Sequence, residues 1–571
     1  MNIRHLAAGL LAPGLLAAFP APAVAQDAVR VPVKEGVLDN GMMILVVERN
    51  EIPTVACVVK FRAGAVDETP GTTGVAHILE HMLFKGTDVW GTTDYAAEKP
   101  LLDRTEELYY GILAARAALP LDLRRNTEKY EEIVRVSHEL GVAEASPESR
   151  RDAAKVELLR EEAKPLLAMG EDVRRVFALE REFAEVQEKA DAFAVDDEDW
   201  GILQRNGAWG LNASTGNDST QYYYSLPANR LELWALVESG RMRNPVLRQF
   251  YKERDVIMQE RLMRLDNNPG GRLWEALNAT AFSAHPYHWP VIGWASDIAR
   301  VSRTEVEAFF RRYYAPNRAV ACIVGDVKFE EVMVLARKYF GGIPRQKDPD
   351  PVRTVEPPQR GEKRAVVQFP GLQVPQLAVA YHRPAIGHPD FYVLDVVIGL
   401  LSGGNSSRLV AEIYWKERIG GVGAGNGDSL YPELFSFFGR PLPEKSLADL
   451  DAAIQRQVER LRDEPVSDRE LQKVRNQNAA QMIRNMESNM GLAQTLTSYE
   501  ILHRWDYINS YQERIAAVTA EDVRRVARKY FRDENKTVVH LVPEPVTGDG
   551  GTGDGGTGDG GTDDGGTDGE E

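Results

Sequence analysis

Apolar and polar residues alternate from Val31 to Phe61, and the turn sequence Asp39-Asn40-Gly41 interrupts the alternation. A period of two is typical of half-buried strands, and Asn-Gly between two such runs predicts a hairpin. The run Thr54–Phe61 (TVACVVKF) is almost continuously apolar, which predicts a buried strand. This segment is therefore expected to begin a sheet.

Helical periodicity begins in the next segment. Residues 74–86 lie between two glycines and repeat apolar positions every three to four residues, which predicts a helix. From about 94 to 199 the chain becomes rich in charged residues, Ala and Leu, with apolar positions at the same helical spacing. We expect an inserted group of helices there. Strand-like sequence resumes at 207–224, and a further helix is expected at 228–242.

One helix-and-strand unit occurs twice. Residues 301–320 (VSRTEVEAFFRRYYAPNRAV) resemble residues 518–538 (VTAEDVRRVARKYFRDENKTV). Both contain a Ser/Thr helix cap, an apolar helical face, a basic-Tyr-aromatic end and a following strand. The second unit is expected to open with a strand at 376–382 and a helix at 391–401, which has no histidine to hold a metal. The repeat predicts two related domains.

The predicted fold class is α+β. Each of the two domains is expected to consist of a mainly antiparallel sheet with helices packed on one side. The first domain is expected at residues 26–347 and the second at 365–546, joined by the Pro-rich, charged linker 348–364. A chain of 571 residues is long enough for each domain to bury its own core. Only the first domain is expected to carry chemistry.

The two ends of the chain differ in composition from the rest. Residues 1–25 contain a basic start, an apolar stretch and Ala-Val-Ala, a pattern typical of a cleaved secretory signal peptide. The apolar stretch is shorter than the ~20 residues that the alternative, a membrane anchor, would need. Residues 547–571 repeat Gly-Asp-Gly-Gly-Thr and predict a disordered, acidic tail. Their five-residue period does not fit the calcium-binding nonapeptide repeats that they superficially resemble.

Charge and cysteine content exclude several classes. The formal net charge is −17, whereas nucleic-acid binding requires a basic surface. The only cysteines, Cys57 and Cys322, lie in apolar strand-like runs, so a zinc site built from four cysteines is excluded. Two buried thiols are the preferred interpretation, and a disulfide, which export would permit, is the alternative.

A possible metal site lies on the helix predicted at residues 74–86. His77 and His81 are four residues apart, so their imidazoles project from one face and can bind one metal ion. Glu80 lies on the same face, where its carboxylate can take a proton from a metal-activated water that attacks a peptide carbonyl. A pair of histidines satisfied within a core is the alternative.

A zinc site of this kind needs a third protein ligand. The segment 251–263 (YKERDVIMQERLM) offers Glu253 and Glu260, which are seven residues apart, about two helical turns, and so lie on one face. One could bind the metal while the other orients a histidine. Spacing alone does not rank the two.

Five motifs follow one another along the chain: HILEHMLFKGT, GLNASTGNDSTQYYY, KERDVIMQE, HPYHWPVIG and the YYAPN…VGD run. In this order they resemble the motifs of the pitrilysin/insulinase family of zinc metallopeptidases, the inverzincins. The chain resembles this family from about residue 30 to residue 545, apart from the helical insert. The resemblance implies that the two domains form half of a clamshell.

The resemblance also implies roles for individual residues. One zinc ion per chain would be held by His77, His81 and Glu260. Glu80 would act as the general base, and Glu253 would be a supporting carboxylate.

A substrate-binding strand is implied in the same way. The strand around Asn212, Ala213 and Ser214 would be an open edge that pairs with the substrate backbone. Strand addition reads mainly the main chain, which gives broad specificity.

The insert is one departure from the family pattern. It makes the chain between His81 and Glu260 much longer than is usual, so its ends must lie close together if the flanking elements are to meet. An insert of this size could roof the chamber or dock a partner, and a solvated helical decoration is an equal alternative.

A missing Arg/Tyr pair is the second departure. Active members complete the site with an Arg and a Tyr from the other half of the clamshell, on a segment similar to 414–421 (YWKERIGG). The matching positions here are Tyr414 and Gly421, so the pair is absent. The preferred interpretation is that a partner subunit supplies both residues, and a degenerate enzyme is the alternative.

The sequence thus predicts a periplasmic or secreted zinc endopeptidase. It would cleave extended peptides or unfolded segments inside a chamber formed with a second, similar subunit, as a heterodimer or a homodimer. A non-catalytic scaffold subunit is the rival hypothesis, and an enzyme that trims one precursor is a third. Neither a nucleic-acid partner nor a membrane span is expected.

Overall fold

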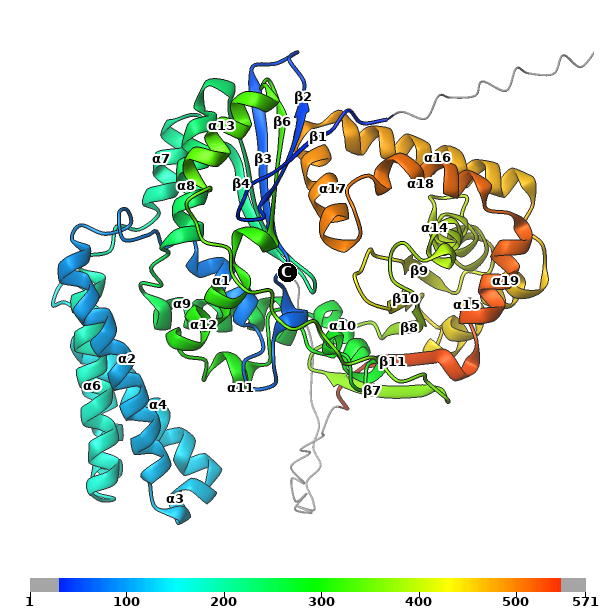
Figure 1. Ribbon diagram of the computed structural model, residues 1–571. Helices are drawn as coiled ribbons and strands as arrows, with labels where there is room; N and C mark the ends of the chain where they lie inside the picture. The colour runs from blue at the N-terminus through cyan, green and yellow to red at the C-terminus, as the bar shows by residue number, and fades with distance from the viewer. Residues whose placement is uncertain (1–29, 546–571) are drawn as a thin grey trace, which may run out of the picture.

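The computed structural model describes residues 30–545 of the 571-residue chain. The expected signal peptide, residues 1–25, and the expected acidic tail, residues 547–571, lie outside the described residues. Two β-sheets with surrounding helices form the body of the molecule, and a group of helices projects from one side (Figure 1). The predicted α+β class is confirmed.

The first sheet has six strands in the order β1-β2-β6-β3-β5-β4. β2 and β6 are parallel, and every other neighbouring pair is antiparallel. The predicted hairpin and the predicted buried strand are both present, as β1–β2 and β3. The strands are β1 (Lys34–Val37), β2 (Met43–Glu48), β3 (Thr54–Phe61), β4 (Trp209–Thr215), β5 (Thr220–Pro227) and β6 (Ala319–Gly325).

The second sheet has five strands in the order β7-β11-β8-β10-β9. Only β7 and β11 are parallel in it. Its strands are β7 (Lys363–Phe369), β8 (Gln376–Arg383), β9 (Gly420–Gly425), β10 (Glu433–Pro441) and β11 (Lys536–Pro543). The sheets that the repeat predicted are therefore mainly antiparallel, as expected.

Each sheet carries a main layer of helices on one face. Over the first sheet and beside it lie α1 (Val75–Met82), α8 (Leu231–Arg243), α9 (Phe250–Arg261), α11 (Ala295–Ile298), α12 (Arg303–Tyr313) and α13 (Phe329–Tyr339). Around the second lie α14 (Pro389–Ser402), α15 (Leu447–Asp463), α16 (Asp468–Glu487), α18 (Tyr507–Ala517) and α19 (Ala520–Tyr530). Within residues 30–545, no helix is both long and apolar enough to cross a membrane.

The opposite face of each sheet is covered by a helix from the other half of the chain. α17 (Asn489–Leu502) packs on β3 and β6 of the first sheet, where Leu496 is fully buried. α10 (Pro269–Ala281) packs on β7, β8 and β11 of the second sheet, where Leu277 is fully buried. Figure 1 shows α17 beside the first sheet and α10 beside the second. The sequence predicted the main helical layers. It did not predict this exchange, in which each half of the chain places one helix on the sheet of the other half.

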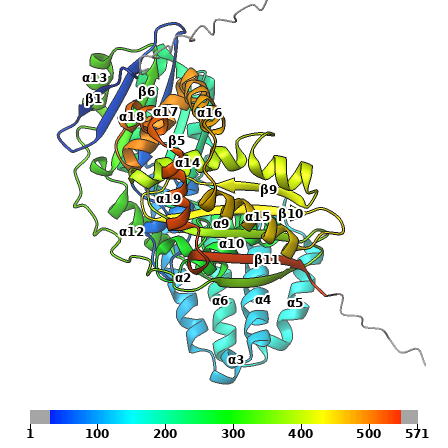
Figure 2. The same ribbon diagram turned by 90° about the vertical axis from the view of Figure 1, so that its right-hand side faces the viewer.

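The insert forms the helical projection at one side of the first sheet (Figures 1 and 2). Its core includes Ile133, Val136 and Val176. Thr92 and Ala194 form an antiparallel backbone bridge, so the ends of the insert meet, as the sequence required. Its helices are α2 (Tyr95–Ala118), α3 (Leu121–Arg125), α4 (Thr127–Ala145), α5 (Ala153–Leu167) and α6 (Glu171–Asp191), followed by α7 (Glu198–Arg205).

A buried ion pair holds the base of the insert. The Arg248 Nε lies 2.9 Å from Glu98 Oε1, and the two side chains are 2% and 0% exposed. Arg248 also donates to the backbone carbonyl oxygens of Lys85 and Thr87, which follow α1. Because Arg248 stands just before α9 and Glu98 lies in α2, this side chain fixes the end of α1 and the starts of α2 and α9 together.

The two cysteines are free thiols in the structure, as preferred. They lie on the neighbouring strands β3 and β6, but Cys57 packs into the core under the main helices whereas Cys322 packs under α17. The two side chains point to opposite faces of one sheet. That arrangement is incompatible with a disulfide between them.

Leu496→Ala should lower the free energy of unfolding by about 2–5 kcal/mol, because it opens a cavity between α17 and the first sheet. Chemical denaturation measures this change. Ile483→Ala is the control, since Ile483 lies on the adjacent α16 with 46% of its surface exposed. That control should change the free energy by less than about 0.5 kcal/mol. Equal effects of both substitutions would contradict a structural role for the exchanged helix.

Candidate metal centre

The position of α1 is fixed at its N-terminus by a buried carboxylate. Glu68 accepts hydrogen bonds from the backbone N–H groups of Gly74 and Ala76, both at 2.9 Å. Burial raises the pKa of Glu68, although these two hydrogen bonds favour its charged form. Gly74 has a φ of 89°, and a Cβ at this position would collide with the carbonyl oxygen of Ile292. The glycine that precedes the motif is therefore required by both conformation and space.

Two histidines of α1 and one glutamate of α9 converge. The ligand atoms of His77, His81 and Glu260 all lie within 4.8 Å of one another. Glu260 Oε2 is 3.8 Å from His77 Nε2 and 3.4 Å from His81 Nε2. Tetrahedral N and O ligands at about 2.1 Å from zinc stand about 3.4 Å apart, so the donor set and spacing fit this metal. No other such trio of His, Cys, Asp or Glu occurs within residues 30–545.

Glu253 lies beside the trio rather than in it. Its Oε1 is 2.9 Å from His81 Nδ1, and its Oε2 is 2.7 Å from Lys85 Nζ. The carboxylate thus holds the far nitrogen of His81, which leaves Nε2 facing Glu260. A carboxylate in this position fixes the ring and its tautomer for metal binding. The structure therefore gives the two glutamates different positions, which their spacing could not assign: Glu260 faces both histidines, whereas Glu253 contacts only one of them, at the far nitrogen of His81.

Glu80 points from α1 toward the edge of the first sheet. The residue is 9% exposed, and its Oε2 accepts a hydrogen bond of 2.5 Å from the Thr215 hydroxyl on β4. Burial raises the pKa of Glu80, although this hydrogen bond opposes the shift. A carboxylate with a raised pKa beside a metal trio is suited to accept and return a proton.

The two histidines differ in their affinity for protons in the metal-free site. Burial, together with the neighbouring charge of His81, lowers the pKa of His77 to about 4. Burial also disfavours the charged form of His81, but hydrogen bonds to Glu253 and Glu260 outweigh it and raise its pKa to about 9. In the metal-free site His81 therefore holds a proton more strongly than His77 does.

β4 is the last strand of the first sheet and pairs only with β5 among the described strands. The Ala213 N–H donates to the Asn212 side-chain oxygen at 2.8 Å instead of joining the ladder. Ser214 accepts a hydrogen bond of 2.9 Å from the Gln221 side chain. All three predicted substrate-binding residues therefore lie on an open edge strand, next to α1 and its Glu80.

Two basic residues at the site were not predicted. Lys85 pairs with Glu253, and Arg264 Nη1 lies 2.8 Å from Glu260 Oε1. Each stands four residues after a motif residue: Lys85 after His81, just beyond the end of α1, and Arg264 after Glu260, in the helical turn that follows α9. That spacing places side chains next to each other, so it was the signal that could have found them.

At the positions that the resemblance matches to the family's Arg and Tyr, the chain has Tyr414 in place of Arg and Gly421 in place of Tyr. Tyr414 lies in the π-helical segment Leu409–Lys416 and is 37% exposed. Gly421 is an exposed residue of β9, and a Cβ built on it would meet nothing within 4 Å. A larger side chain would therefore fit at residue 421, and its absence has no steric cause.

Two family models match the chain. One is described as insulinase (peptidase family M16) and covers residues 44–99, and the other as the peptidase M16 inactive domain and covers residues 300–478. The zinc protease PqqE of Helicobacter pylori is 31% identical over 338 residues, which cover 58% of this chain and 76% of that protein. The chain belongs to the insulinase family of peptidases, family M16.

Solved structures of M16 relatives share the fold. A protease from Helicobacter pylori has a TM-score of 0.68 at 25% identity and is covered to 99%, with 90% of this chain matched. The periplasmic protease PqqL from Escherichia coli has a TM-score of 0.58 at 15% identity, a likeness of fold alone. This match covers 89% of the present chain but only 47% of PqqL. The insulinase-family resemblance and the half-clamshell fold are both confirmed.

Glu253→Gln should lower the pKa of His81 by more than about one unit in the metal-free protein, because glutamine offers no negative charge to the imidazolium. An NMR titration of the His81 ring, starting from a pKa of about 9, measures the shift. Glu131→Gln, at an exposed position of α4, is the control and should leave that pKa unchanged. A variant in which His81 still titrates near its original value would refute the assigned contact.

Proposed function

We propose that this chain is a zinc-dependent endopeptidase that hydrolyses peptides or unfolded segments. The observation that carries the proposal is the position of Glu80, between the His77, His81 and Glu260 trio and an open edge strand. Membership of a peptidase family and the similarity to a protein named as a zinc protease support it. The catalytic domain would comprise residues 26–347, and the second domain, 365–546, would be non-catalytic and joined by the linker 348–364.

His77, His81 and Glu260 would hold one zinc ion per chain. When bound, zinc supplies a Lewis acid that polarises a peptide carbonyl and lowers the pKa of water. Glu253 keeps His81 oriented, and His81 must release its proton before Nε2 can act as a ligand. Glu80 accepts the proton of the attacking water and delivers it to the leaving amine. Thr215 holds the Glu80 carboxylate toward β4 while this happens.

The substrate would bind as an additional strand on β4. Ala213 offers a backbone N–H that only the Asn212 side chain occupies, so an extended peptide can displace that side chain and accept the hydrogen bond. Strand addition places the peptide backbone beside Glu80, which lies one hydrogen bond from Thr215 at the end of the same strand. Because recognition uses the main chain, many sequences can bind.

A second, similar subunit would complete the site. Tyr414 and Gly421 occupy the positions of the Arg and Tyr that active relatives use, so this chain does not supply them. The match to less than half of PqqL supports an arrangement in which two such halves enclose a chamber. The assembly would be a heterodimer whose partner carries Arg and Tyr, or a homodimer.

The site of action would be the periplasm or the exterior of the cell. The composition of residues 1–25 supports this location, and so does the description of PqqL as a periplasmic protease. The insert would be a roof or a docking element at the side of the chamber.

A non-catalytic scaffold is the alternative function. The match of residues 300–478 to a model described as an inactive domain favours it, as does the absent Arg/Tyr pair. The convergence of His77, His81 and Glu260 favours the enzyme, because a scaffold has no need of a complete ligand set.

Glu80→Gln should retain about one zinc per chain but lose at least about 10²–10⁴-fold in kcat, since the general base is removed and the ligands are intact. Elemental analysis and cleavage of fluorogenic peptides measure the two properties. Glu131→Gln should leave both unchanged.

The assay is run on the chain alone and with a related subunit that carries the Arg and Tyr. Activity that appears only with the partner would support the half-site proposal. Undiminished hydrolysis by the Glu80→Gln variant would contradict the role of Glu80 as the general base. Inactivity of the wild type, both alone and with the partner, would favour the scaffold.

Ala213→Pro should raise KM for an extended peptide by about tenfold, because it removes the outward N–H that the substrate would engage. The β5 ladder should be preserved, since that N–H takes no part in it. Steady-state kinetics, with thermal unfolding as the check on folding, measure the effect. Ala213→Gly, which keeps that N–H, is the control and should leave KM near the wild-type value. If the Ala213→Pro variant has the wild-type KM, β4 is not the binding edge.

A further inference from the structure

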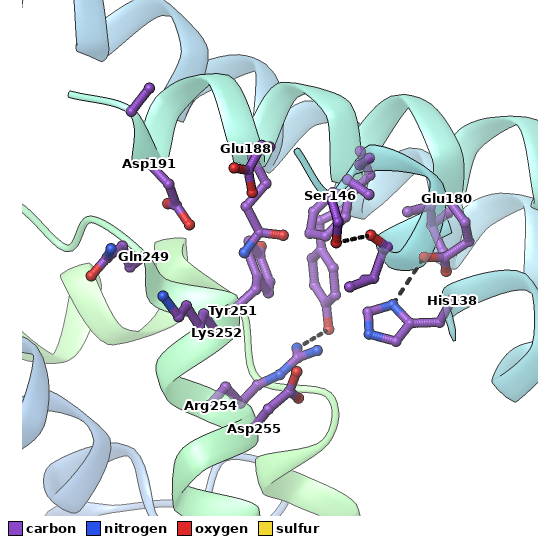
Figure 3. Close-up of a pocket in the computed structure, with 18 of the residues that line it drawn as sticks. His138, Ser146, Glu180, Glu188, Asp191, Gln249, Tyr251, Lys252, Arg254 and Asp255 are labelled. Carbon is purple, nitrogen blue, oxygen red and sulfur yellow. Dashed lines mark hydrogen bonds and ion pairs between the residues drawn. The ribbon is translucent and has the colours of Figure 1, made fainter. Parts of the chain in front are cut away.

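A cavity of about 620 Å³ separates the insert from the side of α9 that faces away from α1. One wall is formed by α2, α4 and α6 of the insert, and the other by α9 and the residues just before it (Figure 3). Its volume lies within the ~300–1,000 Å³ range of ligand pockets. Glu253 and Glu260 point from α9 toward α1, whereas Lys252 and Asp255 lie on the cavity side, so this space is distinct from the metal centre.

Aromatic side chains provide the floor of the cavity. Tyr251 is 5% exposed and contacts Phe183, with ring centroids 5.1 Å apart, and Tyr109, at 4.6 Å. The Arg254 guanidinium lies over Tyr109 and Tyr251 and donates to the Tyr109 hydroxyl at 3.1 Å. Arg254 and the two tyrosines thus interact with one another, and the aromatic rings offer an apolar surface to the body of a ligand.

Charged groups at one end are also paired. Glu180, 3% exposed, lies 2.5 Å from Arg116 Nη2 and 3.3 Å from His138 Nδ1. At the rim, Arg150 pairs with Glu188 at 2.7 Å. This end of the cavity therefore has its charge balanced without a ligand.

The other end holds polar groups without partners. Figure 3 shows Asp191, Gln249 and Lys252 grouped there. None of these side chains takes part in a hydrogen bond or ion pair within residues 30–545, and the same is true of Asp196 and Asp255 on the lining. Unpaired carboxylates therefore outnumber unpaired ammonium groups. Burial raises the pKa of Asp191 to about 6. The positive charge of Lys252 opposes this shift, and the charges of Glu188 and Asp196 add to it.

Gln249 provides an independent sign of a ligand. The residue is 7% exposed, yet its amide has no hydrogen-bond partner in the described part of the chain. Its backbone has a φ of 57°, a left-handed conformation that costs a non-glycine residue energy and is found preferentially at functional sites. The side chain lines the cavity, so a bound group could hydrogen-bond to its amide.

A metal ion does not fit this end. Among residues 30–545, only the trio at the metal centre brings three His, Cys, Asp or Glu ligand atoms within 4.8 Å. The cavity therefore brings no three of these ligand atoms close enough together to hold one ion. A ligand with a directional N–H donor and an apolar body matches both the unpaired acceptors and the aromatic floor.

We propose that this cavity binds a protonated primary amine carried on an apolar body. The ammonium group donates to the Asp191 carboxylate and the Gln249 amide oxygen, and the apolar body lies on Tyr251 and Phe183. Two sources share this chemistry, a small free amine and the amino end of a peptide. The site is independent of the proposed hydrolysis, because none of these residues belongs to the metal centre.

Isothermal titration of the metal-free full-length chain tests the proposal with three probes of similar shape. They are 2-phenylethylamine, which is cationic, 2-phenylethanol, which is neutral, and phenylacetate, which is anionic. The amine should bind at least about tenfold more tightly than the alcohol, a factor typical of one charge-assisted hydrogen bond. The carboxylate should bind most weakly. Equal affinities, or preference for the carboxylate, would overturn the proposal.

Two substitutions locate the binding. Asp191→Asn and Gln249→Gly should each weaken amine binding by about tenfold without lowering the melting temperature, because Asp191 is unpaired and glycine accepts the left-handed backbone. Glu185→Gln is the matched control, on the exposed side of the same helix α6, and should bind the amine like the wild type. Full affinity in the Asp191→Asn variant would refute this site.

A further pair of probes separates the two sources. The tripeptide Phe-Gly-Gly and its N-acetylated form carry the same body with and without the ammonium group. Tighter binding of the free tripeptide than of 2-phenylethylamine assigns the site to peptide ends, and the reverse order assigns it to small amines. Binding of the acetylated form as tightly as the free form would contradict recognition of an amine.

Discussion

The ion pair between Arg248 and Glu98 is the contact on which the candidate site depends. It lies where three segments meet: the end of α1, the start of the insert and the start of α9. Breaking a buried pair of this kind costs about 3–5 kcal/mol, because it leaves an uncompensated charge without water. Loss of this ion pair would also disturb the geometry of the candidate site. α1 supplies two ligands and α9 supplies the third, so the distance between Glu260 and the histidines is set by how these two helices are held together.

Much of the site could be predicted because its key spacing is local. His77, Glu80 and His81 lie within one helical turn, and α-helical geometry alone places them on one face. The choice between Glu253 and Glu260 could not be made in this way. Both lie on the same face of α9, and only the direction in which α1 approaches that face decides which carboxylate meets Nε2 of His81. That direction is a tertiary property, fixed by contacts between distant segments.

The fold shows the same limit. The repeat of 301–320 at 518–538 predicted two related sheets with their main helical layers, because both copies keep an apolar face and a following strand. The positions of α10 and α17 were not predicted. The periodicity of an amphipathic helix predicts that the helix will cover an apolar surface. It does not indicate which of two similar sheets the helix will cover. The cavity behind α9 escaped prediction for a related reason, since its lining combines the insert with residues that are far away in sequence.

The exchange of α10 and α17 also limits how this protein can move. Each sheet is covered on one face by a helix whose chain continues into the other half, and the residues that make those contacts, such as Leu496 and Leu277, are fully buried. A hinge motion between the two halves would have to separate α10 and α17 from the sheets on which they pack. The two halves of this chain are therefore expected to move together. In the proposed assembly with a second subunit, the opening of the chamber would lie along the interface between the subunits.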